Sequence, residues 1–477
     1  MGLGAASAGA FALGGTRVDG RDAAARPGAP FVTSQGAEPA VGPDLQEPAV
    51  RASQNGVLET SLTARLGPTT AAGNAVTSRV YEGGFPGPTL RVRPGDTLRV
   101  RLVNELTGDD AATNLHVHGM HVSPRDNGDN IFLHAMSGEH VDYEYRIPPD
   151  HAAGLYWYHP HVHGDSELQV NNGMVGAIVV EGGLDALPGV GDVTDRLLVL
   201  QATQFGPDGV VLGLEDQSND GALRLINGQL NPTIRLRPGE TQRWRILNAS
   251  ADSFFNLALA GHRLHQIAKD GNPQAEVWSR DAILLAPGER VEVLVQGGAA
   301  GTYELRTMLF GESFQAMPDV VMATVVVEGE PTDPQPLPVA LLPFEDLSEA
   351  PVDLRREISF GISFPATGDP DFLTNGHTFD MDRVDQTVKL GALEEWTITN
   401  TTDEWHPFHI HVNDYQVVAV NGEPVRAWGH EDTTPVPPGG SITMRTRFRT
   451  FTGKFVYHCH LLFHEDHGMM GVIEVVE

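Results

Sequence analysis

More than half of the 20 histidines of this chain fall in four short clusters. In chain order the clusters read NLHVHG, YHPHVHG, WHPFHIH and HCHLLFHEDHGMM. Residues i and i+2 of a β-strand project from the same face, so each His-x-His pair can present two imidazoles to one metal site. A single His-x-His pair on an exposed strand is not evidence of a metal site. Four pairs in two matching parts of the chain, however, predict metal binding.

The single cysteine narrows the choice of metal. Cys459 lies inside the fourth cluster, and a thiolate with two imidazoles and a weak thioether contact is the ligand set of a blue-copper electron-transfer site. Four residues here supply that set: His406, Cys459, His464 and Met469. Zinc also binds cysteine and histidine, but it favours closed tetrahedral sites and leaves the other pairs unexplained. Cys459 and Met469 could instead be buried core side chains, an alternative more natural for the methionine.

The tripeptide around Cys459 predicts a connection between two metal sites. If Cys459 points toward one copper, His458 and His460 must point to the opposite face of the strand. There they would meet the imidazoles of the other His-x-His pairs. One tripeptide would then join the two sites through covalent bonds and carry electrons between them.

An internal repeat indicates the elements that must position these clusters. GPTLRVRPGDTLRVRLVNEL (87–106) and NPTIRLRPGETQRWRILNAS (231–250) share one pattern, and QTVKLGALEEWTITNTT (386–402) is a weaker third copy. Period-two alternation predicts that each copy forms two strands of an antiparallel sheet joined by a tight turn. Three copies predict three related β domains, and the 53 glycines and 33 prolines agree with many turns.

The composition shifts along the chain predict the domain limits. An apolar Gly/Ala stretch near the start resembles the centre of a secretory signal, but no basic residue precedes it. A Pro-rich acidic stretch suits an extended linker. We predict a flexible tail or signal remnant at 1–49, domains at 50–183, 190–329 and 350–477, and a linker at 330–349.

The charge balance excludes two classes of partner. Lys and Arg number 32 against 62 Asp and Glu, a net charge of −30, which is the wrong sign for binding nucleic acid or an anionic membrane surface. No uncharged apolar run reaches the roughly 18 residues of a membrane helix. We therefore expect neither nucleic acid nor membrane as a partner.

The four clusters, in this order, closely resemble the four copper signatures of the multicopper oxidases. The resemblance covers nearly the whole chain beyond the tail, and the motifs are highly specific as a set. It implies an all-β fold of three cupredoxin-like Greek-key β-barrel or sandwich domains. It also implies four copper ions: one type 1 that accepts single electrons, one type 2, and two type 3 that complete a trinuclear cluster reducing dioxygen to water.

The resemblance assigns a copper to each predicted ligand. Type 1 copper would take His406, Cys459 and His464, with Met469 axial. The trinuclear ligands would be His116 and His409 for type 2, His118, His159 and His460 for one type 3 copper, and His161, His411 and His458 for the other. The cluster should lie between domains 1 and 3. The middle domain lacks paired histidines and is predicted to be a spacer that could also form a wall of the substrate cleft.

Two acids resemble the proton-supplying residues of the family. Glu465, directly after His464, resembles the acid on the proton path to the cluster. Asp129 resembles the acid near the type 2 copper, and Asp126 competes for that role because the loop can shift by one register. Either carboxylate could instead be a solvated loop charge.

Laccase-type oxidation of phenols or aromatic amines is the predicted function, with dioxygen as acceptor. Only 11 methionines occur, without a Met-rich segment, which favours a small aromatic donor over Cu(I) because thioethers suit cuprous ion. Two alternatives remain: a cuprous or other metallo-oxidase in copper homeostasis, and a non-enzymatic copper-binding scaffold. Family habit and the signal-like remnant predict a periplasmic or secreted location.

Overall fold

The computed structural model describes residues 41–477 apart from 109–110, 214–215, 313–314 and 367–369. The regular secondary structure of the described chain is almost entirely β-strand, with two short helices, α1 (Ser166–Asn171) and α2 (Leu462–Asp466), and a 3-10 turn, η1 (Gly183–Ala186). None of the helices in this part of the chain is long and apolar enough to span a bilayer. The periplasmic or secreted location stays a prediction.

Domain 1 packs two sheets against each other. One contains, in spatial order, β1 (Val50–Ala52), β4 (Thr89–Val92), β9 (Gly176–Val180), β8 (Gly154–His159) and β6 (His116–His118). The other contains β3 (Asn74–Tyr81), β2 (Val57–Ala71), β5 (Thr97–Asn104) and β7 (His140–Arg146). Alternation along β5 buries Leu98, Val100 and Leu102 and exposes Arg99 and Arg101, so one face of the strand builds the core.

Domain 2 repeats the two-sheet plan with a larger first sheet. That sheet contains β12 (Gln229–Leu230), β11 (Leu223–Ile226), β10 (Thr194–Thr203), β14 (Thr241–Asn248), β19 (Arg290–Gln296), β16 (Leu264–Lys269) and β17 (Asn272–Arg280). The second contains β13 (Thr233–Leu236), β21 (Val320–Val327), β20 (Gly301–Thr307), β15 (Phe255–Leu259) and β18 (Ile283–Leu285). Strand β14 is buried on both faces because domain 1 covers its outer side, where Leu247 packs with Leu155 and Trp157.

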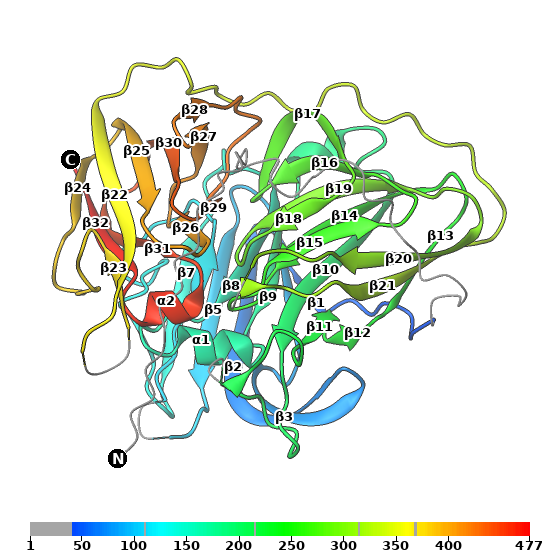
Figure 1. Ribbon diagram of the computed structural model, residues 1–477, viewed down its shortest axis with the longest axis horizontal. Helices are drawn as coiled ribbons and strands as arrows, with labels where there is room; N and C mark the ends of the chain where they lie inside the picture. The colour runs from blue at the N-terminus through cyan, green and yellow to red at the C-terminus, as the bar shows by residue number, and fades with distance from the viewer. Residues whose placement is uncertain (1–40, 109–110, 214–215, 313–314, 367–369) are drawn as a thin grey trace, which may run out of the picture.

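Domain 3 carries the C-terminal clusters on its second sheet. The first sheet contains β23 (Asp371–Thr374), β22 (Leu354–Ser363), β25 (Leu393–Asn400), β30 (Ser441–Arg447), β27 (Tyr415–Val420) and β28 (Glu423–Pro424). The second contains β24 (Gln386–Lys389), β32 (Met470–Val476), β31 (Gly453–Cys459), β26 (His406–Ile410) and β29 (Thr433–Val436). Residues 330–349 run from domain 2 to domain 3 without a strand or helix (Figure 1).

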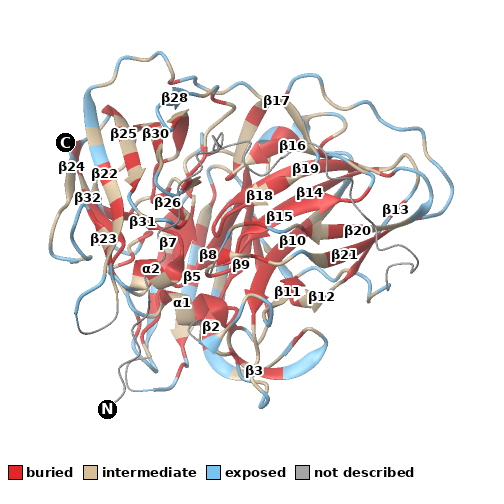
Figure 2. Cartoon of the chain, in the orientation of Figure 1, coloured by how far each residue is buried: buried red, intermediate tan, exposed pale blue. Residues whose placement is uncertain are grey.

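The three domains meet along their most buried strands. Domain 3, yellow to red, and domain 2, green, lie on opposite sides of Figure 1, with the blue and cyan strands of domain 1 below and between them. Figure 2 shows fully buried strand segments where these parts approach one another. The histidine strands β8, β26 and β31 lie in this region (Figure 1), and β6 pairs with β8. The fold thus brings the four sequence clusters to one place.

The repeated turns join strands of different sheets, which corrects the prediction of two strands in one antiparallel sheet. Strands β4 and β5 lie in opposite sheets of domain 1, and β13 with β14 and β24 with β25 divide in the same way. Asp96 stabilises the first of these turns, since its side chain accepts a hydrogen bond from the backbone N–H of Arg93 at 2.8 Å. Alternation shows that a strand has one buried face, but it does not show which sheet the strand joins.

The predicted flexible tail extends too far into the chain. Residues 41–49 are placed against domain 2: Asp44 forms a parallel bridge with Thr233, and the Leu45 side chain packs on that domain's core. The Leu45 backbone N–H donates to the Thr233 carbonyl at 2.9 Å. Low periodicity was misleading because a segment added to a sheet edge needs only backbone hydrogen bonds. Residues 1–40 lie outside the described part of the chain.

Candidate metal centres

Three predicted ligands converge in domain 3. His406 begins β26, Cys459 ends β31, and His464 lies in α2. Cys459 Sγ lies 3.4 Å from His406 Nδ1 and 3.8 Å from His464 Nδ1, and the two Nδ1 atoms are 3.1 Å apart. These three buried side chains form a group that could hold one metal ion.

Met469 closes the loop around this group. The backbone N–H of Cys459 donates to the Met469 carbonyl at 3.0 Å, and the N–H of Met469 donates to the His464 carbonyl at 2.9 Å. Met469 is fully buried and belongs to the same apolar core as Cys459. The backbone therefore brings all four predicted residues of this set together.

The protein environment holds the two imidazoles in place and disfavours their charged forms. His406 Nε2 contacts Thr402 Oγ1 at 2.7 Å, and the His464 ring stacks on Phe372 with centroids 4.2 Å apart. Burial lowers the pKa of His406 to about 3 and raises the pKa of the Cys459 thiol well above its usual value. A thiolate here requires a nearby cation, which a bound metal ion supplies.

Eight buried histidines form a second group between domains 1 and 3. In domain 1 His116 faces His159 across β6 and β8, and in domain 3 His409 faces His458 across β26 and β31. The two halves stack ring on ring with centroids 3.8 Å apart, His116 on His411 and His118 on His409. The members of this histidine cluster are His116, His118, His159, His161, His409, His411, His458 and His460.

Backbone carbonyls determine which ring nitrogens face inward. His159 Nδ1 lies 2.8 Å from the Pro160 carbonyl and His409 Nδ1 lies 2.7 Å from the Asp432 carbonyl. A carbonyl can only accept, so each Nδ1 carries the proton and each Nε2 keeps a lone pair. Within the described residues these Nε2 atoms have no hydrogen-bond partner although they are buried.

The unpaired nitrogens show that the cluster fits metal ions. A buried lone pair without a partner costs free energy, and a metal cation removes that cost. His161, His411 and His458 have ligand atoms close enough to share one ion, and so do His116, His118 and His159. The buried unpaired atoms are Nε2 of His116, His159 and His409, Nδ1 of His118 and His411, and both ring nitrogens of His460.

Asp129, and not Asp126, reaches the cluster. Both Asp129 carboxylate oxygens lie 3.0 Å from His116 Nδ1, and Asp129 Oδ1 accepts a hydrogen bond from the Val117 N–H at 3.0 Å. Burial raises the pKa of Asp129 to about 8. Asp126 is exposed in a turn with φ 53°. The geometry therefore separates two candidates that the sequence left open.

Glu465 contacts one cluster histidine from domain 1 and one from domain 3. Its carboxylate oxygens are 3.0 Å from His458 Nδ1 and 3.3 Å from His161 Nδ1. Burial alone would raise the pKa of Glu465, but the adjacent His161 and His458 hold it below its usual range. Glu465 is thus placed to exchange protons with histidines from both domains.

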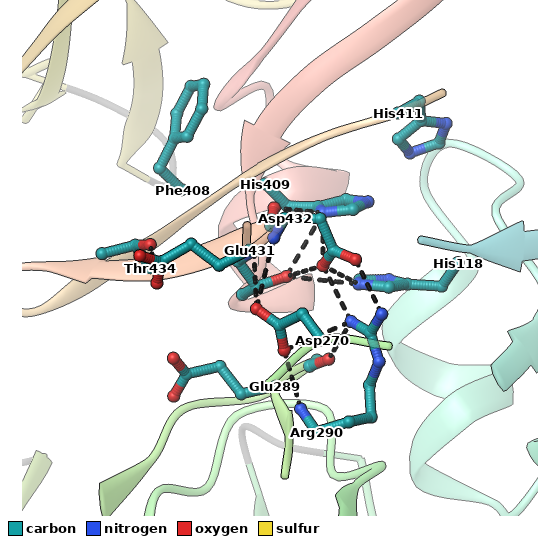
Figure 3. A network of polar contacts seen from close by, with 12 residues as sticks. His118, Asp270, Glu289, Arg290, Phe408, His409, His411, Glu431, Asp432 and Thr434 are labelled. Carbon is teal, nitrogen blue, oxygen red and sulfur yellow. Dashed lines mark hydrogen bonds and ion pairs between the residues drawn. The ribbon is translucent and has the colours of Figure 1, made fainter. Parts of the chain in front are cut away.

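Two charged residues at the cluster were not found from the sequence. Asp432 Oδ1 lies 3.1 Å from His118 Nε2, and Arg290 of domain 2 forms an ion pair with Asp432 (Figure 3). The one sequence feature that could have pointed to Arg290 is its position as a charged residue at the start of the mostly apolar strand RVEVLVQ. Domain 2 therefore does more than the spacer role predicted for it.

Comparison with known proteins settles the family. Family profiles described as multicopper oxidase match residues 65–184, 199–330 and 352–477. The chain belongs to the multicopper oxidase family. The predicted family, the all-β fold of cupredoxin-like domains and the assignment as an oxidoreductase enzyme are confirmed, and the family implies copper as cofactor. Membership of an oxidase family favours an enzyme over the non-enzymatic scaffold.

Proteins described by different activities are similar to this chain. A multicopper oxidase of Staphylococcus haemolyticus is 28% identical over 463 residues, which span 93% of this chain and 94% of the relative. A Campylobacter jejuni multicopper oxidase described as a metallo-oxidase has a TM-score of 0.80 and 27% identity, covering 92% of this chain and 96% of that one. A Pediococcus acidilactici laccase has a TM-score of 0.78 and 27% identity, covering 93% and 95%.

Proposed function

We propose that this multicopper oxidase is of the laccase type and oxidises a small aromatic donor, with dioxygen as acceptor. The observation that carries the proposal is the set of buried imidazole nitrogens without a partner, which lie beside a separate Cys–His–His group. Copper bound at Cys459 supplies a one-electron acceptor, and copper bound at the histidine cluster supplies the centre at which dioxygen is reduced to water.

The proposed ligand sets follow the resemblance, and their members all lie in the two groups of side chains described above. His406, Cys459 and His464 hold the type 1 copper with Met469 beside it. The sets for the cluster are His116 and His409 for type 2, His118, His159 and His460 for one type 3 copper, and His161, His411 and His458 for the other. The Nε2 atoms of His161 and His411 lie 3.2 and 3.3 Å from His458 Nε2, which supports the last set.

Cys459 links the two centres covalently. It ends a β-strand, so its side chain and those of its neighbours His458 and His460 point to opposite sides. Cys459 Sγ contacts His406 and His464, whereas His458 and His460 contact rings of the histidine cluster. The peptide bonds of this tripeptide are the shortest covalent path between the sites.

Donors approach the His464 side of the type 1 site. His464 is 8% exposed, whereas His406 and Cys459 are completely buried. Glu404 Oε2 lies 3.5 Å from His464 Nε2 and can accept a proton that an oxidised phenol releases. Asp129, whose pKa burial raises to about 8, can hold a proton for dioxygen reduction beside His116, and the ionised Glu465 can pass protons between His161 and His458.

A metallo-oxidase is the second candidate. The exposed Asp380, Met381 and Asp382 offer carboxylate and thioether groups next to one another. Their loop contacts the type 1 loop, since the Phe379 N–H donates to the Gly468 carbonyl at 3.0 Å. A single methionine is fewer soft ligands than cuprous ion prefers, so an aromatic donor remains the first proposal.

Oxygen uptake by the copper-loaded protein distinguishes the two. We would compare a simple methoxyphenol with Cu(I) at equal concentration, using Cys459→Ser as the control for donor-independent uptake. Faster uptake with the phenol is the expected result. Faster uptake with Cu(I) would replace the laccase with a metallo-oxidase, and uptake no greater than in Cys459→Ser would contradict both.

A further inference from the structure

A turn of domain 2 packs directly against the histidine cluster. Gly288 precedes β19 with φ +87°, and a Cβ atom built on it would lie 3.0 Å from His460 Cδ2 and 3.1 Å from His118 Cε1. Both the left-handed backbone and the close approach require glycine. The middle domain therefore forms part of the wall around the cluster.

Arg290, two residues later, forms a two-pronged ion pair with Asp432 of domain 3. Arg290 Nη1 and Nη2 donate to Asp432 Oδ1 and Oδ2 at 2.7 and 2.6 Å (Figure 3). The Asp432 carboxylate also contacts His118 Nε2 of domain 1, and the Asp432 carbonyl accepts from His409 Nδ1 of domain 3. Asp432 thus orients one cluster histidine from domain 1 and one from domain 3.

The guanidinium of Arg290 reaches all three domains. Its Nε donates to the Leu155 carbonyl of domain 1 at 3.2 Å, and its Nη1 lies 3.5 Å from Asp270 Oδ1 of domain 2. Asp270 also accepts from the backbone N–H groups of Arg290 and Asp432, at 2.9 and 3.2 Å. Arg290 and Asp270 are completely buried, so the guanidinium, Asp432 and Asp270 are held by one another and not by water.

The glycine of the first histidine motif is explained by the same contact. Gly119 follows His118 with φ +82°, and a Cβ atom on it would lie only 2.3 Å from both Arg290 Nη2 and Asp432 Oδ2. The ion pair therefore passes directly over the backbone that carries His118.

We propose that Arg290 is a positioning residue of the oxidase. Through Asp432 it holds His118 and His409 at the distance and ring orientation that the copper cluster requires. This inference rests on the proposed function, because it assumes that the histidine cluster binds copper. Acceptors that orient metal-binding histidines typically affect metal affinity about 10- to 100-fold when they are lost. The alternative is that Arg290 only joins the domains mechanically.

Arg243 offers a matched control for that alternative. It is 3% exposed, and its Nε donates to Glu292 at 2.7 Å while its Nη1 donates to Asp185 at 2.5 Å. It is thus a buried arginine of domain 2 that bonds two acids, like Arg290, and no contact with the histidine cluster is recorded for it among the described residues. Arg243→Gln should weaken the fold without moving the cluster.

The experiment measures copper retained by each centre of the full-length holoprotein against a graded chelator. The thiolate–copper visible absorption reports the Cys459 site, and the type 2 signal in electron paramagnetic resonance reports the cluster. We expect Arg290→Gln to release cluster copper at about 10- to 100-fold less chelator than wild type, while the Cys459 site is retained. Arg243→Gln should keep the wild-type pattern and lose only thermal stability.

Other results would overturn the proposal. Equal losses in Arg290→Gln and Arg243→Gln would leave only a mechanical role, and so would wild-type retention in Arg290→Gln. If Arg290→Gln does not fold, Arg290→Lys keeps the charge but lacks the two-pronged geometry, and it must then show the selective loss of cluster copper. A wild-type protein whose cluster binds no copper would contradict the proposed function itself.

Discussion

Domains 1 and 3 end in nearly the same strand pair but differ in one residue between their histidines. Both pairs have the same register: His116 faces His159 in domain 1, and His409 faces His458 in domain 3. Domain 3 places Cys459 after the facing histidine, where domain 1 has a proline. The two domains therefore have the same histidines on the strand face that points toward the cluster, but different residues on the opposite face.

The opposite face of domain 1 is filled by core and turn residues. Thr113 stands three residues before His116, as His406 stands before His409, and its hydroxyl bonds to Gln169 Oε1 at 2.7 Å. Met174 lies in the same Gly-Met turn as Met469 and is likewise fully buried, yet no cysteine accompanies it. A methionine at this position is therefore no evidence of a metal site unless the cysteine and histidines are also present.

The largest effect should come from exchanging the residue that distinguishes the two domains. Cys459→Ser should abolish the thiolate–copper absorption and donor oxidation, because no other thiol exists in the chain. Adding Pro160→Cys to that variant should restore neither, since Thr113 offers no imidazole. Visible spectra and copper content would test both variants, and a restored absorption would show that the cysteine alone defines the site.

Asp129→Asn should lower turnover about 100-fold, because the amide cannot deliver protons to the cluster beside His116. Asp126→Asn is the matched control: it changes an exposed residue of the same loop and should leave turnover unchanged. Steady-state oxygen uptake with a saturating donor measures the effect. A loss in Asp126→Asn equal to that in Asp129→Asn would contradict the assignment.

The copper-free protein should lose stability in acid because of its buried imidazoles. Burial lowers the pKa of His161 from 6.5 to about 4. Between pH 6.5 and pH 4 the histidine is protonated in the unfolded chain but neutral in the folded chain. The free energy of unfolding therefore falls as the pH drops from 6.5 toward 4, by roughly 3 kcal/mol for this residue. The fall in denaturant midpoint on acidification should be smaller in His161→Gln, in which the other buried histidines remain, and unchanged in His134→Gln, which changes an exposed histidine. A flat wild-type profile would refute this.

The smallest expected effect is a change in reduction potential that distinguishes Met469 from Met174. Met469→Leu should keep the copper and raise the reduction potential of the type 1 site by about 60 mV, a tenfold change in a one-electron equilibrium, because leucine offers no axial sulfur. Met174→Leu should leave the potential unchanged and cost less than about 1.5 kcal/mol, as a volume-conserving core exchange. Redox titration of the visible band measures both, and identical potentials would show that Met469 is only a core residue.

Sequence patterns were most informative where neighbouring residues act together. The spacing of His458, Cys459 and His460 predicts two opposite faces, and the structure places those side chains in two separate groups. Sequence patterns did not predict which sheet a strand joins, as shown by β4 and β5, which lie in different sheets. The patterns favoured Asp129 but left Asp126 open beside it, since one turn with a positive φ at Asp126 decides which carboxylate points inward.

By itself the sequence determined the types of candidate ligand, their grouping in pairs, the three repeats and, through its motifs, the family. These depend on side-chain chemistry and on strand periodicity, which are local properties. Only the tertiary structure decided that Arg290 and Gly288 touch the cluster and that Asp432 orients histidines of two domains. Arg290 lies 142 residues from the acid it pairs with, and no local pattern encodes a contact that forms only when three domains close on one another.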